Sequence, residues 1–286
     1  MTARRQRTIA RPVLVEGFGL FGGADVQMSL LPAPANTGLV FQRVDLPGRP
    51  RVPARIDCLV TQPRRTILER GAARVEMVEH VLAALAGMWV DNCLIQLDAL
   101  EPPVGDGSSL EIVEALLHAG IAEQKAPHTP IPVFADLSVN STTERGTVTA
   151  RPSDGWTIRY DLDYGNTVIP RQSFTATITP EEFVREIAFA RTFVLESEVA
   201  MLKARGFGQR ATTQNLLVFG PRGIVENRLR AADECARHKV LDCIGDLALC
   251  GGSPVGHFHA IQSGHHQNHR MVEQMLQAVQ AERQSA

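Results

Sequence analysis

The sequence predicts an α+β protein made of two similar domains, each a sheet layered with helices. Three observations lead to this prediction. Strand-like runs precede helix-like runs in both halves of the 286-residue chain, a proline-rich segment separates the halves, and one helical motif occurs in each half. A chain of this length can form two domains, each with its own core. We expect a first domain at residues 1–126 and a second at residues 127–286.

The first half begins with short strands separated by turns. Strand-like runs cover residues 13–16, 26–31 and 39–43, and the second of them alternates apolar with polar residues. The glycines of GFGLFGG at 17–23 have the G-x-G-x-x-G spacing of a dinucleotide-binding turn. That site needs a helix directly after the glycines. A strand pattern follows instead, so we expect a glycine-rich hairpin.

Two helices and one more strand complete the first half. The pattern predicts a helix over 78–88, a strand over 93–97 and a second helix from 110 that ends before Gly120. The longest apolar stretch, residues 75–97, is interrupted by charged and amide side chains. This composition excludes a membrane span.

A proline-rich segment marks the predicted domain boundary. Residues 123–132 contain three prolines, and we expect no regular structure there because proline and the residue before it disfavour helices and sheets. Strand patterns return over 133–178. Helices are predicted at 181–189, 196–204 and 231–249, the last ended by a glycine pair.

One helical motif appears in both halves. HVLAALAG at 80–87 resembles HKVLDCIG at 238–245. If the halves are duplicates, these two helices are equivalent, and we expect them to face each other across the domain junction. Clefts at such junctions commonly bind ligands.

Composition limits the class of partner. Lys and Arg total 29 and Asp and Glu total 31, a balance that argues against nucleic acid or an anionic membrane as the main partner. Five cysteines without a C-x-x-C pair indicate reduced thiols rather than disulfides or a zinc cage. The basic N-terminus lacks the apolar stretch of a secretory signal. We therefore expect a cytoplasmic protein.

The helix at 231–249 carries residues suited to metal binding. His238 and Asp242 are four residues apart and share one helix face, which Asp246 continues for another turn. An imidazole and a carboxylate at this spacing can bind a divalent ion, although most such pairs are solvated hydrogen-bonded pairs. A third ligand is needed. His80 is the candidate, with Glu79 beside it as a base for a metal-activated water; a buried core histidine after a helix-capping glutamate is the alternative.

Two further segments have weaker signals. Residues 263–269 contain three histidines, which favour an exposed start of the final helix; a second metal site, or one histidine that reaches the cleft, are the alternatives. The segment at 190–193 ends a helix with Thr192 and Phe193, and these two residues indicate no chemistry on their own.

Longer motifs resemble the zinc-dependent UDP-3-O-acyl-N-acetylglucosamine deacetylases of lipid A biosynthesis. They run along nearly the whole chain: LLPAPANTG at 30–38, VEHVLAALAG at 78–87, VDN at 90–92, DGS at 106–108, ARTF at 190–193, RHKVLDCIGDL at 237–247 and SGH at 263–265. The resemblance implies two similar α+β domains whose helices pack together at the junction, with the active site between them.

The resemblance implies one catalytic zinc ion, with iron(II) as an alternative occupant in the cell. The implied metal ligands are His80 from the first domain and His238 and Asp242 from the second. Glu79 is the implied general base, which deprotonates the water that attacks the acetamide carbonyl. The products are acetate and a free amine.

Further roles follow from the same resemblance. His265 is the implied acid that protonates the leaving amine, and Asp246 orients and charges it. Lys239 and Thr192 are implied near the oxyanion. For substrate binding, the resemblance implies Phe193, Tyr164 and, through a loose alignment, Arg145 towards the diphosphate. The implied partner is a UDP-linked acylated amino sugar bound by a monomer.

Some positions depart from the family pattern. Phe21 replaces a histidine of the opening hairpin, Met77 a threonine and Tyr164 a phenylalanine, and the segment 206–215 differs from a more glycine-rich one. These departures leave open a paralogue that uses the same zinc chemistry on another N-acetylated sugar. A third alternative is a non-catalytic module that binds a sugar nucleotide or a protein.

Overall fold

The computed structural model describes residues 4–128, 130–140, 146–165 and 168–285. Each of its two main sheets contains a series of five neighbouring, hydrogen-bonded strands. The first sheet has the order β2-β3-β9-β4-β5, in which β4 and β9 are parallel and the other neighbours antiparallel. Its strands are β2 (Val13–Phe18), β3 (Asp25–Pro32), β9 (Cys93–Leu97), β4 (Leu39–Arg43) and β5 (Arg51–Pro53). Strand β3 directly follows the glycine turn, so the predicted hairpin is confirmed.

The second sheet repeats this topology. Its order is β12-β13-β19-β14-β15, again with one parallel pair, β14 and β19, among antiparallel neighbours. Strand β11 (Pro130–Pro132) joins it in parallel to β19. The remaining strands are β12 (Leu137–Asn140), β13 (Thr147–Arg151), β19 (Ser253–Ile261), β14 (Trp156–Leu162) and β15 (Gln172–Thr177). The matching orders confirm the predicted α+β fold of two similar units.

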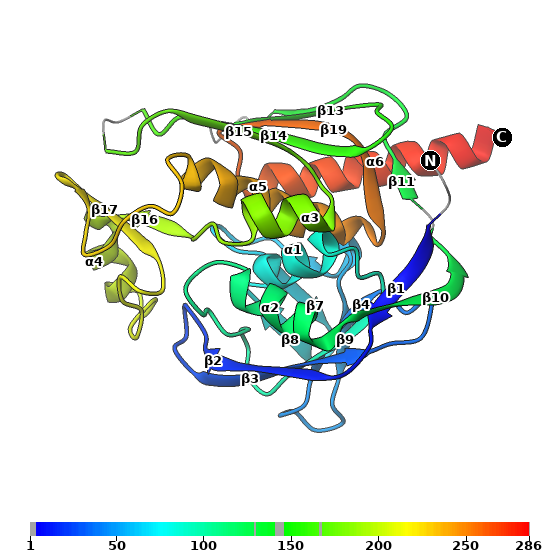
Figure 1. The fold of residues 1–286 in the computed structure, drawn as a ribbon, viewed down its shortest axis with the longest axis horizontal. Coiled ribbons are helices and arrows are strands. Elements are labelled where there is room, and N and C mark those ends of the chain that lie inside the picture. The colour runs from blue at the N-terminus through cyan, green and yellow to red at the C-terminus, as the bar shows by residue number, and fades with distance from the viewer. Residues whose placement is uncertain (1–3, 129, 141–145, 166–167, 286) are drawn as a thin grey trace.

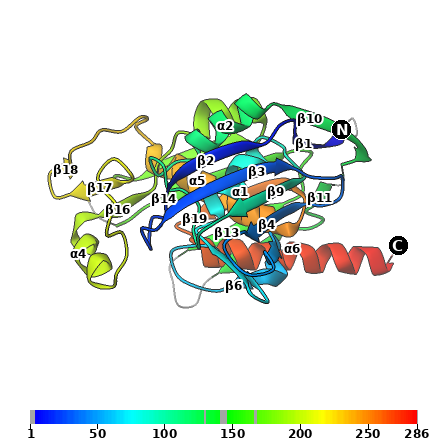
Figure 2. The ribbon, with the colours of Figure 1, turned by 90° about the horizontal axis from the view of Figure 1, so that it is seen from below.

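Helices fill the space between the two sheets (Figure 1). They are α1 (Glu79–Gly87), α2 (Leu110–Ala119), α3 (Pro180–Glu182), α5 (Glu234–Leu247) and α6 (His265–Ser285). Figure 2 looks onto the first sheet, with α1 and α5 behind it. No helix within the described ranges combines the length and apolar character that crossing a bilayer requires.

Helices α1 and α5 approach so closely that only glycine fits at their contact. A Cβ atom on Gly245 would lie 2.0 Å from the carbonyl oxygen of Glu79. The backbone of α5 therefore rests on the first turn of α1, which carries Glu79 and His80. The two repeated motifs face each other, as the sequence predicts.

Each unit also contains an inserted small sheet that the sequence pattern did not predict. The first insertion is β6 (Leu59–Val60), β7 (Ile67–Arg70) and β8 (Ala73–Glu76), preceded by a short 3-10 helix at Ile56–Cys58. The second is β16 (Phe193–Leu195), β17 (Leu217–Gly220) and β18 (Gly223–Ile224), with α4 (Glu196–Ala204) between its first two strands. This second insertion projects from one end of the molecule (Figure 1).

The proline-rich segment forms strands, so the prediction that it lacks regular structure is wrong. Strand β10 (Ile121–Pro127) pairs with β1 (Arg5–Ile9), and β11 follows. The prolines stand at the ends of these strands, where a missing N–H is tolerated. Because β10 ends at Pro127, the domain division between residues 126 and 127 remains a proposal.

Two helix predictions also need adjustment. The expected helix at 181–189 is one short turn, α3, followed by π-helical turns at Phe183–Ile187. Helix α5 begins at Glu234 rather than 231 and continues as a 3-10 helix at Ala248–Cys250.

Replacing Gly245 by alanine should destabilise the fold. Alanine has the higher helix propensity, by about 1 kcal/mol, but its Cβ would force α1 and α5 apart, and overpacking costs about 1–3 kcal/mol. Chemical denaturation should show a net loss of stability for Gly245→Ala. Gly155→Ala is the matched control, because a Cβ there meets nothing within 4 Å. Equal stability of Gly245→Ala and the native protein would contradict the argument.

Candidate active site

Three potential metal ligands converge where α1 meets α5. The Oδ1 atom of Asp242 lies 3.6 Å from Nε2 of His80 and 3.5 Å from Nε2 of His238. The three ligand atoms all lie within 4.8 Å of one another. Two imidazole nitrogens and one carboxylate oxygen suit zinc and related divalent ions. The residues present therefore fit a metal ion, and three ligands leave a coordination position for water or substrate.

Neighbouring groups hold two of these ligands in the form that binds a metal. Nδ1 of His238 lies 3.1 Å from the carbonyl oxygen of Ala190, which leaves Nε2 free. Burial lowers the pKa of His238 to about 3, so the imidazole is neutral. Burial alone would raise the pKa of Asp242, but the Lys239 ammonium holds it well below its usual value. The Lys239 ammonium donates to Oδ2 of Asp242 at 2.7 Å, on the side away from the two imidazoles.

Glu79 is the buried carboxylate beside this cluster. Its side chain begins α1 and is 2 % exposed. One carboxylate oxygen accepts a hydrogen bond from the backbone N–H of Thr66 at 3.1 Å, and the other lies 3.9 Å from Nε2 of His265. Burial raises the pKa of Glu79, which makes its carboxylate a better proton acceptor.

His265 and Asp246 form a second buried pair. Nδ1 of His265 lies 2.8 Å from Oδ2 of Asp246. Burial alone would lower the pKa of His265, but the Asp246 carboxylate outweighs it and raises the pKa to about 9. His265 is therefore a protonated imidazole near neutral pH and can donate a proton.

Three further residues contact Asp246: Thr66, which no sequence pattern singled out, and Asn268 and His269 of the histidine-rich segment 263–269. His269 is 4 % exposed, whereas His266 is exposed, so the prediction of exposed histidines holds only for His266. The four-residue spacing of His265 and His269 is the signal that could have placed both on one helix face.

A cavity of about 1020 Å³ opens over these groups and extends into the second insertion. Thr192, Phe193 and Tyr164 line it, and the rings of Tyr164 and Phe193 meet edge to face at 5.7 Å. Much of its outer part is apolar, formed by Leu195, Val199, Leu202, Phe207, Ala211, Leu216 and Val218. Arg145 lies outside the described residues, so the structure does not place it.

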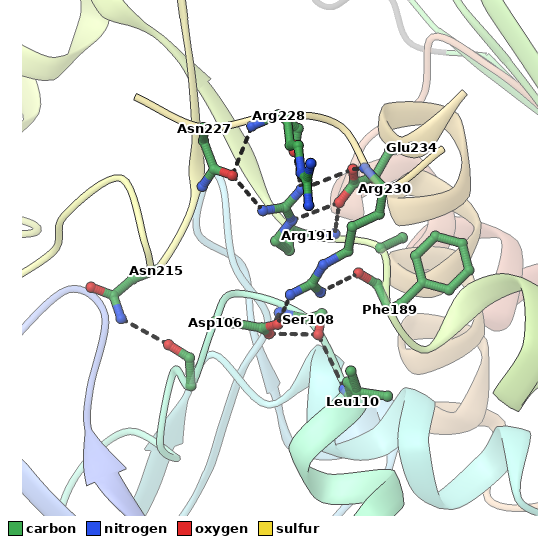
Figure 3. A network of polar contacts seen from close by, with 12 residues as sticks. Asp106, Ser108, Leu110, Phe189, Arg191, Asn215, Asn227, Arg228, Arg230 and Glu234 are labelled. Carbon is green, nitrogen blue, oxygen red and sulfur yellow. Dashed lines mark hydrogen bonds and ion pairs between the residues drawn. The ribbon is translucent and has the colours of Figure 1, made fainter. Parts of the chain in front are cut away.

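A polar network fixes the segment that carries Thr192 (Figure 3). The Arg191 guanidinium donates to both carboxylate oxygens of Glu234, at 2.7 and 3.1 Å, and both side chains are buried. Glu234 begins α5, so this pair links Thr192 to the helix of His238 and Asp242. Arg230 extends the network to Asp106 of the first unit at 2.5 Å. The backbone N–H of Thr192 donates to the carbonyl of Gly107.

Residues that depart from the family pattern line the cavity. Phe21 meets Phe207 edge to face at 4.8 Å, and the Arg65 guanidinium lies 4.8 and 5.4 Å from these two ring centres. The N–H of Gly208 donates to the carbonyl of Phe21. The opening hairpin and the segment 206–215 are therefore in direct contact. Met77 also lines the cavity, with a positive φ of 58°.

Comparison with known proteins shows the family. The family model described as UDP-3-O-acyl N-acetylglycosamine deacetylase matches residues 6–277. The chain belongs to this deacetylase family. A relative from Anaeromyxobacter sp. (strain Fw109-5), named UDP-3-O-acyl-N-acetylglucosamine deacetylase, is 39 % identical over 279 residues, which are 96 % of this chain and 90 % of the relative.

Two other members of the deacetylase family carry the same name. The protein of Pseudomonas entomophila (strain L48) is 34 % identical over 95 % of this chain and 90 % of its own length. That of Myxococcus xanthus (strain DK1622) is 36 % identical over 95 % of this chain and 86 % of its own length. The resemblance drawn from the motifs is thus confirmed, while the roles of single residues stay predictions.

Asp242→Ala should abolish metal binding in this deacetylase-family chain. The substitution removes the central ligand and leaves the Lys239 ammonium beside the two imidazoles. We expect less than one tenth of the metal of the native protein by elemental analysis after dialysis. Asp57→Ala, on an exposed side chain, is the control and should keep its metal. A folded Asp242→Ala protein with one ion per chain would refute the ligand assignment.

Proposed function

We propose that this chain is a metal-dependent amidohydrolase that removes the N-acetyl group of UDP-3-O-acyl-N-acetylglucosamine, in lipid A biosynthesis. The products are acetate and the free amine. The observation that carries the proposal is the convergence of three groups at one end of the cavity: the metal-binding cluster, the buried Glu79 and the protonated His265. A base, an acid and an open metal site together serve hydrolysis rather than binding alone. The names of the relatives support the choice of substrate.

His80, His238 and Asp242 would hold the metal. We propose zinc, which these donor types suit, with iron(II) as an alternative in the cell. When bound, the ion supplies Lewis acidity, which polarises an amide carbonyl and lowers the pKa of water.

The protein's own side chains perform the proton transfers. Glu79 removes a proton from the attacking water as the general base, and burial, which raises the pKa of Glu79, favours this proton uptake. His265 donates a proton to the departing nitrogen, which would otherwise leave as a poor anionic group. Asp246 stabilises the imidazolium before transfer and orients its ring. The 3.9 Å separation between a Glu79 carboxylate oxygen and Nε2 of His265 supports the proposal that both act on one amide group.

Thr192 and Lys239 complete the polar side of the site. We propose that the Thr192 hydroxyl donates to the oxyanion that develops on the acetyl group. Lys239 adds positive charge near that oxygen and, through its hydrogen bond to Asp242, also orients a metal ligand. The Arg191–Glu234 pair keeps Thr192 in place relative to α5.

The cavity suits a substrate with a polar head and an apolar chain. Its apolar walls in the second insertion fit the acyl group. Phe193 and Tyr164 line the same cavity, and the Phe193 ring lies 6.0 Å from that of His238. Arg145 remains our proposal for a contact with the diphosphate. A monomer in the cytoplasm completes the proposal, and the five free cysteines fit a reducing compartment.

The contact between Phe21 and Phe207 favours one second candidate. It replaces a polar group of the cavity lining by an aromatic pair, so the site could act on a different N-acetylated sugar with the same chemistry. Parallel assays with simple N-acetylated sugar nucleotides distinguish this candidate from the first.

Turnover should depend on both the metal and Glu79. The zinc-loaded protein should release free amine from UDP-3-O-acyl-N-acetylglucosamine, and a chelated sample should not. Glu79→Gln should retain its metal and lose turnover by about a hundredfold or more, the usual contribution of a positioned base. Glu69→Gln, on an exposed side chain, is the control. A folded, metal-loaded native protein without turnover on any of these sugars would contradict hydrolysis.

The pH profile should report the pair of His265 and Asp246. The imidazolium is present below its pKa of about 9 and is lost above it, so kcat should fall as the pH rises through this value. Asp246→Asn removes the charge that raises the pKa, and the alkaline limb should then move to lower pH. Steady-state assays from pH 6 to 10 check this shift. An unchanged limb in Asp246→Asn would assign it to another group.

A further inference from the structure

Asp246 is surrounded by four hydrogen-bonding groups. Oδ2 lies 2.8 Å from Nδ1 of His265 and accepts from Nδ2 of Asn268 at 2.9 Å. Oδ1 accepts from the Thr66 hydroxyl at 2.6 Å and lies 3.2 Å from Nε2 of His269. The carboxylate is fully buried, and two oxygens offer about four acceptor sites. Every acceptor site of Asp246 is therefore occupied by a protein group.

The donor and acceptor chemistry of the groups assigns the protons on the Oδ1 side. An ionised carboxylate only accepts, so the Thr66 hydroxyl donates to Asp246. Oγ1 of Thr66 also lies 3.0 Å from Nε2 of His269, and with its proton committed it can only accept there. Nε2 of His269 therefore carries a hydrogen, which it shares between Thr66 and Asp246. Because Thr66 and His269 are both buried, water does not replace these donors.

Thr66 contacts the base as well as the partner of the acid. Its backbone N–H donates to Glu79 at 3.1 Å, while its hydroxyl donates to Asp246. Its carbonyl accepts from the N–H of Val78, just before α1. Thr66, a fully buried residue of the first insertion, thus links Glu79 to the pair of Asp246 and His265.

His269 supports the same arrangement from α6. Its ring stacks on that of His265, with the planes 27° apart and the centres 6.2 Å apart. It lies one helical turn beyond His265 and reaches the opposite oxygen of the same carboxylate. With both oxygens held, Asp246 cannot rotate away from His265.

We propose that Thr66 and His269 are positioning residues of the deacetylation reaction. Both hold the Asp246 carboxylate against His265, and Thr66 also holds the Glu79 carboxylate through its backbone N–H. Neither lines the substrate cavity, so both act through other residues. The inference rests on the proposed function. Partners of this kind typically contribute about tenfold to a hundredfold in activity, because they hold the reacting groups in their productive geometry.

Two matched pairs of variants test the proposal. Thr66→Val removes the hydroxyl and keeps the shape and the backbone N–H, whereas Thr66→Ser keeps the hydroxyl. His269→Phe removes the ring donor, whereas His269→Gln retains an N–H donor of similar reach. We expect Thr66→Val and His269→Phe to lower kcat about tenfold to a hundredfold, with KM within about twofold and full metal content. The Ser and Gln variants should recover most of the lost kcat.

A double-mutant comparison separates positioning from a general loss of packing. If Thr66 and His269 act through Asp246, their substitution in an Asp246→Asn background should change kcat little further. Equal losses in both backgrounds would overturn the proposal. So would folded, metal-loaded Thr66→Val and His269→Phe proteins with kcat within twofold of the native protein, or a change in KM alone.

A spectroscopic measurement keeps the test independent of turnover. The Nδ1 proton between His265 and Asp246 should give a downfield proton resonance, identified by its loss in His265→Gln. It should shift or broaden in Thr66→Val and return in Thr66→Ser. An unchanged resonance in Thr66→Val overturns the positioning role. Absence of turnover in the native protein, by contrast, defeats the proposed function and leaves this resonance to decide the inference.

Discussion

The contact of two helix backbones at Gly245 is the constraint on which the site depends. With no side chain on Gly245, α5 lies against the carbonyl of Glu79, and the first turn of α1 faces the middle of α5. That approach brings Glu79 and His80 next to His238, Asp242 and Asp246. The sheets on either side bury the helices and exclude water from the charges between them. Burial lowers the pKa of His238 to about 3, whereas the Asp246 carboxylate outweighs burial and raises the pKa of His265 to about 9.

Charge in the site is organised as two carboxylates of α5, each with its own cation. Asp242 pairs with the Lys239 ammonium and Asp246 with the His265 imidazolium. The second oxygen of each carboxylate has a separate set of neighbours. That of Asp242 faces the imidazoles of His80 and His238, and that of Asp246 faces Thr66 and His269. Burial makes every one of these charges costly unless it is paired, so the network is specified as a whole.

Much of this arrangement could be predicted from the sequence. Periodic apolar patterns predict the helices, and residue spacing predicts which side chains share a helix face. The helices of His80 and His238 have clear apolar patterns, and the spacing of His238, Asp242 and Asp246 puts them on one face. The small inserted sheets escaped prediction because their strands are only two to four residues long. Thr66 escaped for a different reason: a threonine before a short strand has no signal of its own, and its importance arises from contacts 180 and 203 residues away. The proline-rich segment forms strands because β10 pairs with β1 and β11 with β19. Local composition does not reveal these partners, which are distant in the sequence.

The duplicated topology has a consequence for how such a site can arise. His80 and His238 occupy the same position in the repeated motif, and Gly87 corresponds to Gly245. In the folded chain, each motif presents one imidazole to the same oxygen of Asp242. Position 84 is alanine where its counterpart, 242, is aspartate, so the carboxylate exists in one copy only. The two motifs are therefore not equivalent at the site, because only the second supplies a carboxylate between the imidazoles. Since both motifs lie in one chain they can differ, as those of two identical subunits could not.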